Sequence, residues 1–224
     1  MYKTPEIQKK KPKIRKALKS RFTEANLIQD IVLTQPLSVR VFHWGFALSM
    51  VIVIITGFEL HKPASFLAVN FGQVFVLHIA AAFIASGLVA FRIFDALIRH
   101  DTSLIPSLKD LKMLPKLMAY YFFLRSTPPP SGKYNSGQKL IFSSWIIVFI
   151  ISSVLGLASY WLGEHLIWVW RFIGGAQVIR WSKFVATIYF TCTIPVHIYL
   201  SLTEDLSKLQ AMVTGYEKNS PETP

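Results

Sequence analysis

Three histidines, His43, His78 and His197, lie inside long apolar runs of this 224-residue chain. An ionisable ring is costly to place in hydrocarbon, so a residue of this kind usually serves a functional site rather than facing the lipid. A neutral imidazole is also a common ligand of haem iron. We therefore consider haem sites within a membrane first. A hydrogen-bonded histidine inside a helical bundle is the alternative for each residue taken alone.

The apolar runs that carry these histidines are long enough to cross a bilayer. A membrane-spanning helix needs about 20 consecutive apolar residues, and four stretches of the chain reach that length. They lie near residues 41–60, 73–98, 141–162 and 181–203. These runs lack the polar periodicity of an amphipathic soluble helix. We expect an all-α integral membrane protein, built as a bundle of four transmembrane helices.

The sequence outside the spans divides the chain into three parts. A basic arm over residues 1–38 precedes the membrane domain, residues 39–203, and a polar tail follows at 204–224. The long loop between the second and third spans mixes apolar and basic residues from 104 to 124. Such a composition is typical of an amphipathic helix that lies in the membrane interface. The single cysteine, Cys192, excludes a disulfide within the chain and an iron–sulfur cluster held by this chain alone.

The net charge of +12 is distributed unevenly along the chain. Residues 1–40 carry ten Lys and Arg, and residues 99–140 carry seven. Because positive charge concentrates on the cytoplasmic side, both termini and the 99–140 loop are predicted to be cytoplasmic, in a protein of the inner (plasma) membrane. The basic arm is best explained by attraction to anionic lipid. No recognition motif accompanies the charge, so we expect no nucleic-acid partner.

The four spans place the histidines at two depths. His43 begins the first span and His197 ends the fourth, so both lie near the cytoplasmic face, where two axial imidazoles can hold one haem. His78 begins the second span near the outer face, and the residue at that depth in the fourth span is Lys183. Lys183 precedes His197 by 14 positions, about 21 Å and just under four helical turns. This spacing suits two haems, one near each face.

Two other classes of protein use similar residues. A transporter or proton channel also carries intramembrane histidines, although the chain shows neither the repeats nor the broken helices common in transporters. A haem-free anchor that holds an enzyme at the bilayer is the second alternative.

Six short segments of the sequence, taken in their order along the chain, resemble a known family. They are RVFHW, LHIAAAFIASGLVAFR, GKYNSGQK, VIRWSK, VHIY and AMVTGY. The chain from Arg40 to Tyr216 is similar to the cytochrome b (gamma) subunit of membrane-bound respiratory formate dehydrogenase. Cytochromes b of respiratory hydrogenases share the four-helix plan but less of the segment Tyr134–Lys139. A formate dehydrogenase complex is therefore our main expectation, and a hydrogenase or another redox complex is the alternative.

The resemblance implies two b-type haems. It assigns the inner haem to His43 and His197. It assigns the outer haem to His78 and a family histidine that is Lys183 here. If Lys183 is no ligand, either His61 or His165 replaces it, or the chain holds one haem only.

The resemblance also implies a menaquinone or ubiquinone site beside the inner haem. Asn135 and Gln138 would line it, with a helix cap as the alternative role for Asn135. Arg40 is expected to bind a haem propionate, and Arg92 either a propionate or Asp95. The expected function is electron transfer between an iron–sulfur partner subunit and the quinone pool. A separate catalytic dehydrogenase subunit would oxidise the substrate, because this chain alone does not oxidise formate.

Overall fold

The computed structural model describes residues 31–61, 70–161, 171–204 and 206–218. The chain forms two compact units. The larger unit covers residues 41–198 and holds the apolar helices. The smaller unit joins the residues before 41 to those after 198. His165 and most of the basic arm lie outside the described residues.

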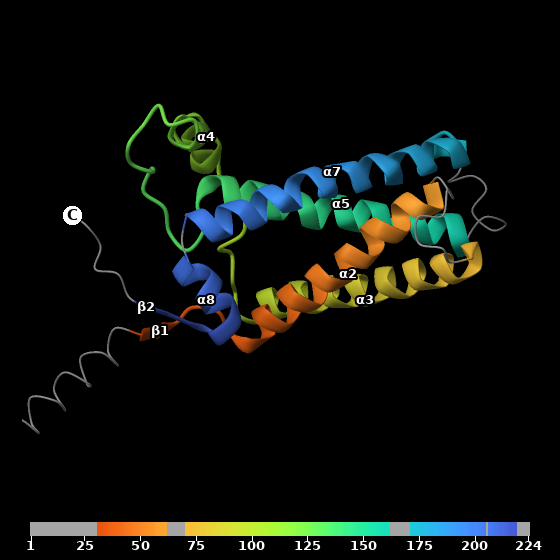
Figure 1. Cartoon of the computed structure of the whole chain (residues 1–224), viewed down its shortest axis with the longest axis horizontal. Coiled ribbons are helices and arrows are strands. Elements are labelled where there is room, and N and C mark those ends of the chain that lie inside the picture. The colour runs from red at the N-terminus through yellow and green to blue at the C-terminus, as the bar shows by residue number, and fades with distance from the viewer. Residues whose placement is uncertain (1–30, 62–69, 162–170, 205, 219–224) are drawn as a thin grey trace, which may run out of the picture. The chain divides into compact units, whose positions relative to one another are not determined.

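Four helices are long and apolar enough to cross a membrane, as predicted. They are α2 (Leu37–His61), α3 (Phe71–Ile98), α5 (Ser136–Trp161) and α7 (Ala176–Thr203). In the larger unit these helices run alongside one another (Figure 1). Each predicted span lies almost wholly inside one of them. Helices α2, α5 and α7 begin four or five residues before the apolar runs, about one turn, and α3 begins two residues before its run.

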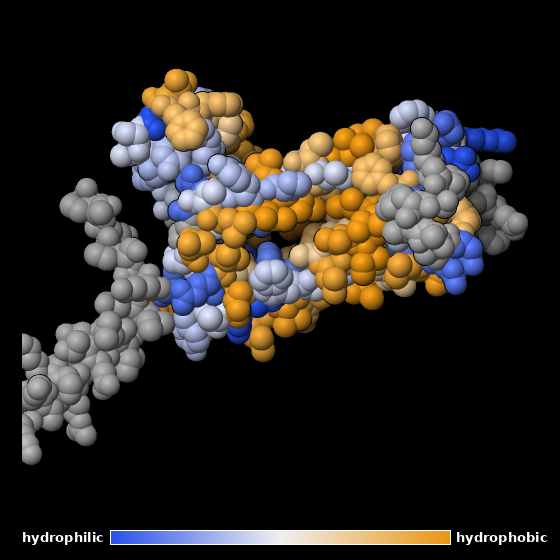
Figure 2. Space-filling view, in the orientation of Figure 1, coloured by the Kyte–Doolittle hydropathy of each residue, from blue (hydrophilic) through white to orange (hydrophobic). Residues whose placement is uncertain are grey.

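The bundle core takes side chains from all four spanning helices. α2 contributes Met50, α3 contributes Ala85 and Val89, α5 contributes Phe149, and α7 contributes Phe190. Elsewhere the spans bury little: in none is more than 22% of the most apolar stretch buried. Large apolar side chains therefore cover the outside of the bundle, as a lipid-facing surface requires (Figure 2).

The interfacial helix predicted in the loop is α4 (Leu108–Tyr121). Ser107 caps its first turn, and Leu117 is its buried contact, only 2% exposed. Leu108 is 80% exposed, and further large apolar side chains project outward along α4 and just after it. Helix α4 thus keeps an uncovered apolar surface, in the way a helix at a lipid interface does.

Helix α4 approaches the start of α5 closely. A Cβ atom added to Gly137 would lie 2.9 Å from Cδ2 of Leu117. That distance is shorter than real Cβ contacts, so a side chain at position 137 would make Leu117 shift. Gly137 thus allows the close approach of Leu117 to α5.

The smaller unit contains structure that the sequence analysis did not predict. Strand β1 (Ile31–Leu33) pairs antiparallel with β2 (Tyr216–Lys218), with Ile31 opposite Lys218. Helix α8 (Leu206–Thr214) precedes β2. Gly215, at a φ of +95°, follows α8, and its carbonyl accepts hydrogen bonds from the backbone N–H groups of residues 34 and 35. Segments from both ends of the chain thereby form one unit.

Candidate functional site

His43 of α2 and His197 of α7 lie side by side, as their matched depth predicts. Their ring centroids are 6.4 Å apart and the ring planes are 66° apart. Two imidazoles this close, on two different helices, could hold one metal ion between them. The pair therefore suits the two nitrogen ligands that a b-type haem would take.

Aromatic side chains enclose the His197 ring. Phe142 and Trp145 of α5 meet it edge-on, at centroid distances of 5.2 and 5.5 Å. The indole Nε1 of Trp145 donates a hydrogen bond of 2.8 Å to Oγ1 of Thr193. Because that bond fixes the indole plane, α5 presents a rigid apolar wall to His197.

The larger unit has features that suit a flat apolar cofactor between its helices. In the described part of the chain, no group lies within hydrogen-bonding distance of the buried Nδ1 of His43. Figure 2 shows a hollow between the apolar side chains in the middle of the visible face. A b-type haem needs two nitrogen ligands and apolar walls, which His43 and His197 with Phe142 and Trp145 supply, so these residues fit that group.

His78 of α3 contacts α2 rather than a second histidine. Its Nδ1 lies 2.9 Å from the Oγ1 atom of Thr56, a side chain that is 1% exposed. A Cβ atom on the adjacent Gly57 would lie 3.7 Å from Cε1 of His78 and 3.5 Å from Oγ1 of Thr187. Helices α2, α3 and α7 therefore meet at the level of His78.

Lys183 lies one turn of α7 before Thr187, whose hydroxyl donates a 3.0 Å hydrogen bond to the Lys183 carbonyl. The Lys183 side chain is half-buried. A Cβ atom at Gly57 would contact both Thr187 and His78, so the turn of α7 that carries Lys183 lies at the level of His78. The role of Lys183 as a ligand stays a prediction. His61, the alternative ligand, stacks on Phe184 with centroids 3.9 Å apart. Among the described residues, no cluster of three or more His, Cys, Asp and Glu could bind a metal ion.

Asn135 and Gln138 cap the first turn of α5. Gln138 Oε1 accepts a 3.0 Å hydrogen bond from the backbone N–H of Asn135, and Asn135 Oδ1 accepts a 2.8 Å bond from that of Gln138. Asn135 Nδ2 lies 3.4 Å from the Tyr121 hydroxyl. Both amide oxygens are therefore engaged by the helix. The groups suited to a quinone carbonyl are the NH₂ donors, and the Gln138 amide is the principal one.

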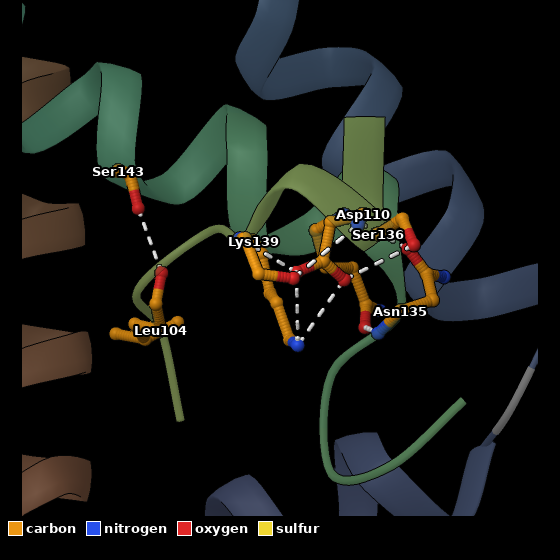
Figure 3. A network of polar contacts seen from close by, with 8 residues as sticks. Leu104, Asp110, Asn135, Ser136, Lys139 and Ser143 are labelled. Atoms are coloured by element: carbon orange, nitrogen blue, oxygen red, sulfur yellow. Dashed lines mark hydrogen bonds and ion pairs between the residues drawn. The ribbon is translucent and has the colours of Figure 1, made fainter. Parts of the chain in front are cut away.

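A polar network beside this cap joins α4 to α5 (Figure 3). One oxygen of Asp110 accepts hydrogen bonds from Ser107, through its hydroxyl at 2.7 Å and its backbone N–H at 2.8 Å. The other accepts from Ser136 and Lys139, both at 3.2 Å. These bonds, those from Ser107 first, hold the pKa of the Asp110 carboxyl well below its usual range. Asp110 is thus a carboxylate that fixes α4 against α5.

Arg92 is the buried cation near the end of α3, with its side chain 5% exposed. Its Nη2 donates a 3.0 Å hydrogen bond to Asp101, and Nη1 lies 3.9 Å from Asp95. Burial raises the pKa of Asp101, but hydrogen bonds from Ser103 and Arg92 outweigh it and lower that pKa below its usual value. Arg92 pairs with Asp95, as one of its two predicted roles requires, and more closely with Asp101.

Arg40 lies in the smaller unit. Its Nη1 donates a 2.7 Å hydrogen bond to the carbonyl of Val213, and its buried Nε has no partner in the described residues. A propionate role for Arg40 therefore stays a prediction.

Comparison with protein families decides the class of this bundle. The profile of the prokaryotic cytochrome b561 family matches residues 34–215. This chain belongs to that family. It is a multi-pass inner-membrane protein of the b-type cytochromes, and the family implies b-type haem.

Two curated relatives of this cytochrome b561 family member carry the same descriptive name. A protein of Azotobacter vinelandii is 24% identical over 207 residues, covering 83% of this chain and 86% of its own length. A protein of Cupriavidus necator is 26% identical over 212 residues, covering 80% of this chain and 83% of its own length. Both are called probable Ni/Fe-hydrogenase B-type cytochrome subunits.

The expectation of a formate dehydrogenase gamma subunit is therefore corrected, since the relatives favour the hydrogenase alternative. That expectation depended on the segment Tyr134–Lys139. In the structure Asn135 and Gln138 of this segment cap α5, and Gly137 admits Leu117. These are roles in helix geometry, and they carry no information about which enzyme the cytochrome serves.

Sequence reasoning missed two residues of the candidate site, Thr56 and Trp145. Thr56 is the hydrogen-bonding partner of His78, and Trp145 orients the wall beside His197. A threonine in an apolar run is a weak signal, because its hydroxyl commonly bonds its own helix.

Proposed function

We propose that this cytochrome b561 family member is the membrane cytochrome b subunit of a hydrogenase-type complex. It would exchange electrons between an iron–sulfur partner subunit and the quinone pool, menaquinone or ubiquinone. The closeness of the His43 and His197 rings, on two facing helices, carries the redox part of the proposal. The hydrogenase part rests on the names of the relatives.

His43 and His197 are the proposed ligands of the inner haem. When bound, the haem would supply reversible one-electron transfer. The chain's own part is to hold the two rings on facing helices and to exclude water from them with Phe142 and Trp145. Apolar surroundings of this kind tune a redox site by lowering its local dielectric.

The proposed quinone contact lies at the start of α5. The Gln138 amide NH₂ would donate to a quinone carbonyl, while its oxygen continues to cap the helix. The rings of Tyr134 and Phe142 meet edge-on, with their centroids 6.2 Å apart, and Phe142 in turn contacts His197. These rings would offer an aromatic surface to a quinone ring. Asn135 would then act mainly by holding Gln138 in place.

The proposed outer haem has His78 and Lys183 as its ligands. An amine binds iron only when it is neutral, so burial and the metal must together remove the proton of Lys183. The meeting of α2, α3 and α7 at Gly57 supports this assignment, because it brings the Lys183 turn to the level of His78.

The charge distribution supports an orientation in which both termini and α4 are cytoplasmic. The inner haem and the quinone contact would then lie near the cytoplasmic face. Reporter fusions after residues 103 and 218 test this orientation, and activity of an exported reporter at either position would contradict it.

The decisive experiment for the partner is purification of the native complex from membranes under mild detergent. We expect a nickel–iron catalytic subunit and an iron–sulfur subunit to co-purify, and hydrogen to reduce the haem in the complex. Reduction by formate and not by hydrogen would contradict the hydrogenase assignment. Reduced protein without haem absorption would favour the membrane-anchor or transporter alternative.

A further inference from the structure

The Thr56 hydroxyl has a single hydrogen. The direction in which that hydrogen points determines the tautomer of the His78 ring. A threonine hydroxyl has one hydrogen to donate and lone pairs to accept with. Thr56 Oγ1 lies 2.6 Å from the carbonyl oxygen of Ile52, one turn earlier in α2. Because a carbonyl oxygen can only accept, the single hydrogen of Thr56 points to Ile52.

The bond between Thr56 and His78 must then run from the ring. With its hydrogen engaged, the hydroxyl presents lone pairs to His78 Nδ1 at 2.9 Å, so Nδ1 is the donor and carries the hydrogen. The carbonyl oxygen of Val53 lies 3.3 Å from the same hydroxyl, so both nearby backbone carbonyls of α2 can only accept the Thr56 hydrogen.

A neutral imidazole with a hydrogen on Nδ1 has its lone pair on Nε2. A Cβ atom at Gly57 would lie in van der Waals contact with the ring, 3.7 Å from Cε1, so α2 packs closely against His78 here. Since α2 engages Nδ1, Nε2 is the ring nitrogen left to bind a metal. Histidines that bind metals are commonly fixed in this way by a second hydrogen bond.

We infer that Thr56 is a positioning residue for the outer haem, holding His78 in the tautomer and orientation that present Nε2 to iron. This inference rests on the proposed function, because it requires His78 to be a ligand. Thr56 itself would make no direct contact with the haem. The loss of such a bond typically weakens metal binding by about 10–100-fold.

The test compares Thr56→Val with Thr56→Ser in the purified full-length cytochrome. Valine keeps the shape and removes the hydroxyl, whereas serine keeps the hydroxyl. Haem is titrated into the protein, and the haem count, the electron paramagnetic resonance spectrum and the midpoint potential of each haem are measured. We expect Thr56→Val to weaken binding of one haem by about 10–100-fold and to alter its spectrum. Thr56→Ser should match the unaltered protein.

The inner haem serves as the control for folding, because His43 precedes Thr56 by 13 positions of α2, about 20 Å along the helix. If Thr56→Val also loses the inner haem, Thr56→Ala replaces it in the same comparison. Unchanged affinity, spectrum and potential of both haems in the hydroxyl-free variant would overturn the inference.

His78→Ala separates this inference from the proposal on which it rests. If His78→Ala removes one haem while Thr56→Val changes nothing, only the positioning role of Thr56 fails. If His78→Ala keeps the full haem count, the outer haem assignment fails, and the inference fails with it.

Discussion

Asn135 and Gln138 cap one another at the start of α5, each accepting a hydrogen bond from the backbone N–H of the other. This reciprocal pair uses the two amide oxygens and leaves the amide NH₂ of Gln138 as a donor. Capping and quinone binding are therefore carried by different atoms of the same side chain. The two roles can be separated by substitution.

Gln138→Glu is expected to slow quinone reduction without weakening the helix. Glutamate retains an oxygen for the Asn135 N–H and suits a helix N-terminus, but it has no NH₂ donor. Loss of that donor should lower the rate of quinone reduction by about tenfold, measured with an artificial electron donor. Asn135→Asp, which also preserves the cap, is the matched control. A Gln138→Glu variant with the full rate would show that the Gln138 amide does not contact quinone.

Attachment of α4 to α5 is expected to weaken in acid through Asp110. Its pKa is held below the ordinary carboxyl value, chiefly by Ser107, so its ionised form favours the folded state. This contribution is complete above about pH 4, the ordinary value, and is lost as the pH falls toward the folded-state pKa. Amide exchange of α4, corrected for intrinsic rates, should therefore be constant from pH 7 to about 4 and faster below.

Asp110→Asn is the control for that profile. It removes the ionisable group, so α4 should exchange faster than in the unaltered protein already at pH 7 and should lose the acid-dependent change. An unaltered protein whose α4 exchange does not respond to acid would contradict the role of Asp110.

Arg92 and Asp101 are expected to be energetically coupled. Arg92 is buried, and its closest anionic contact is the 3.0 Å bond to Asp101. Asp101→Asn alone should destabilise the bundle, because the buried Arg92 cation then loses the negative charge nearest to it. A double-mutant cycle with Arg92→Leu should give a coupling free energy of about 1–3 kcal/mol. Haem loss in Arg92→Leu, without coupling to Asp101, would instead indicate a propionate contact.

The second ligand of the outer haem can be tested at Lys183. If Lys183 binds iron, Lys183→His should keep two haems and change the spectrum of one, because imidazole replaces an amine. Lys183→Ala should lose the outer haem or leave its iron with one protein ligand. Haem count and low-temperature absorption of the purified variants provide the measurement. Identical spectra in all three proteins would exclude Lys183 as a ligand.

The spanning helices and the inner site could be predicted from the sequence. Apolar length determines where a helix can cross a bilayer, and the order of the spans determines the depth of each residue. His43 and His197 were placed at one depth by these two rules alone, and the structure brings their rings together. Depth also predicts that Lys183 and His78 lie at one level, and the packing of Thr187 and His78 against Gly57 agrees with it.

The parts that could not be predicted depend on contacts between distant segments. The pairing of β1 with β2 joins residues near the two ends of the chain, and strands of three residues are too short to give a periodic hydropathy pattern. The Asp110–Lys139 contact required the packing of α4 on α5. The relatives favour the hydrogenase alternative over the expected formate dehydrogenase. Asn135, Gly137 and Gln138 serve helix capping and packing, which do not distinguish one enzyme complex from another.

The central claim is that His43 and His197 hold one haem iron between them. Its most direct test is the absorption and electron paramagnetic resonance of the purified cytochrome, alongside His43→Ala and His197→Ala. We predict sharp reduced b-type bands and a low-spin signal of two imidazole ligands, with the same haem lost or converted to high spin in both variants. A reduced spectrum without haem bands, or a low-spin signal unchanged in either variant, would contradict the account.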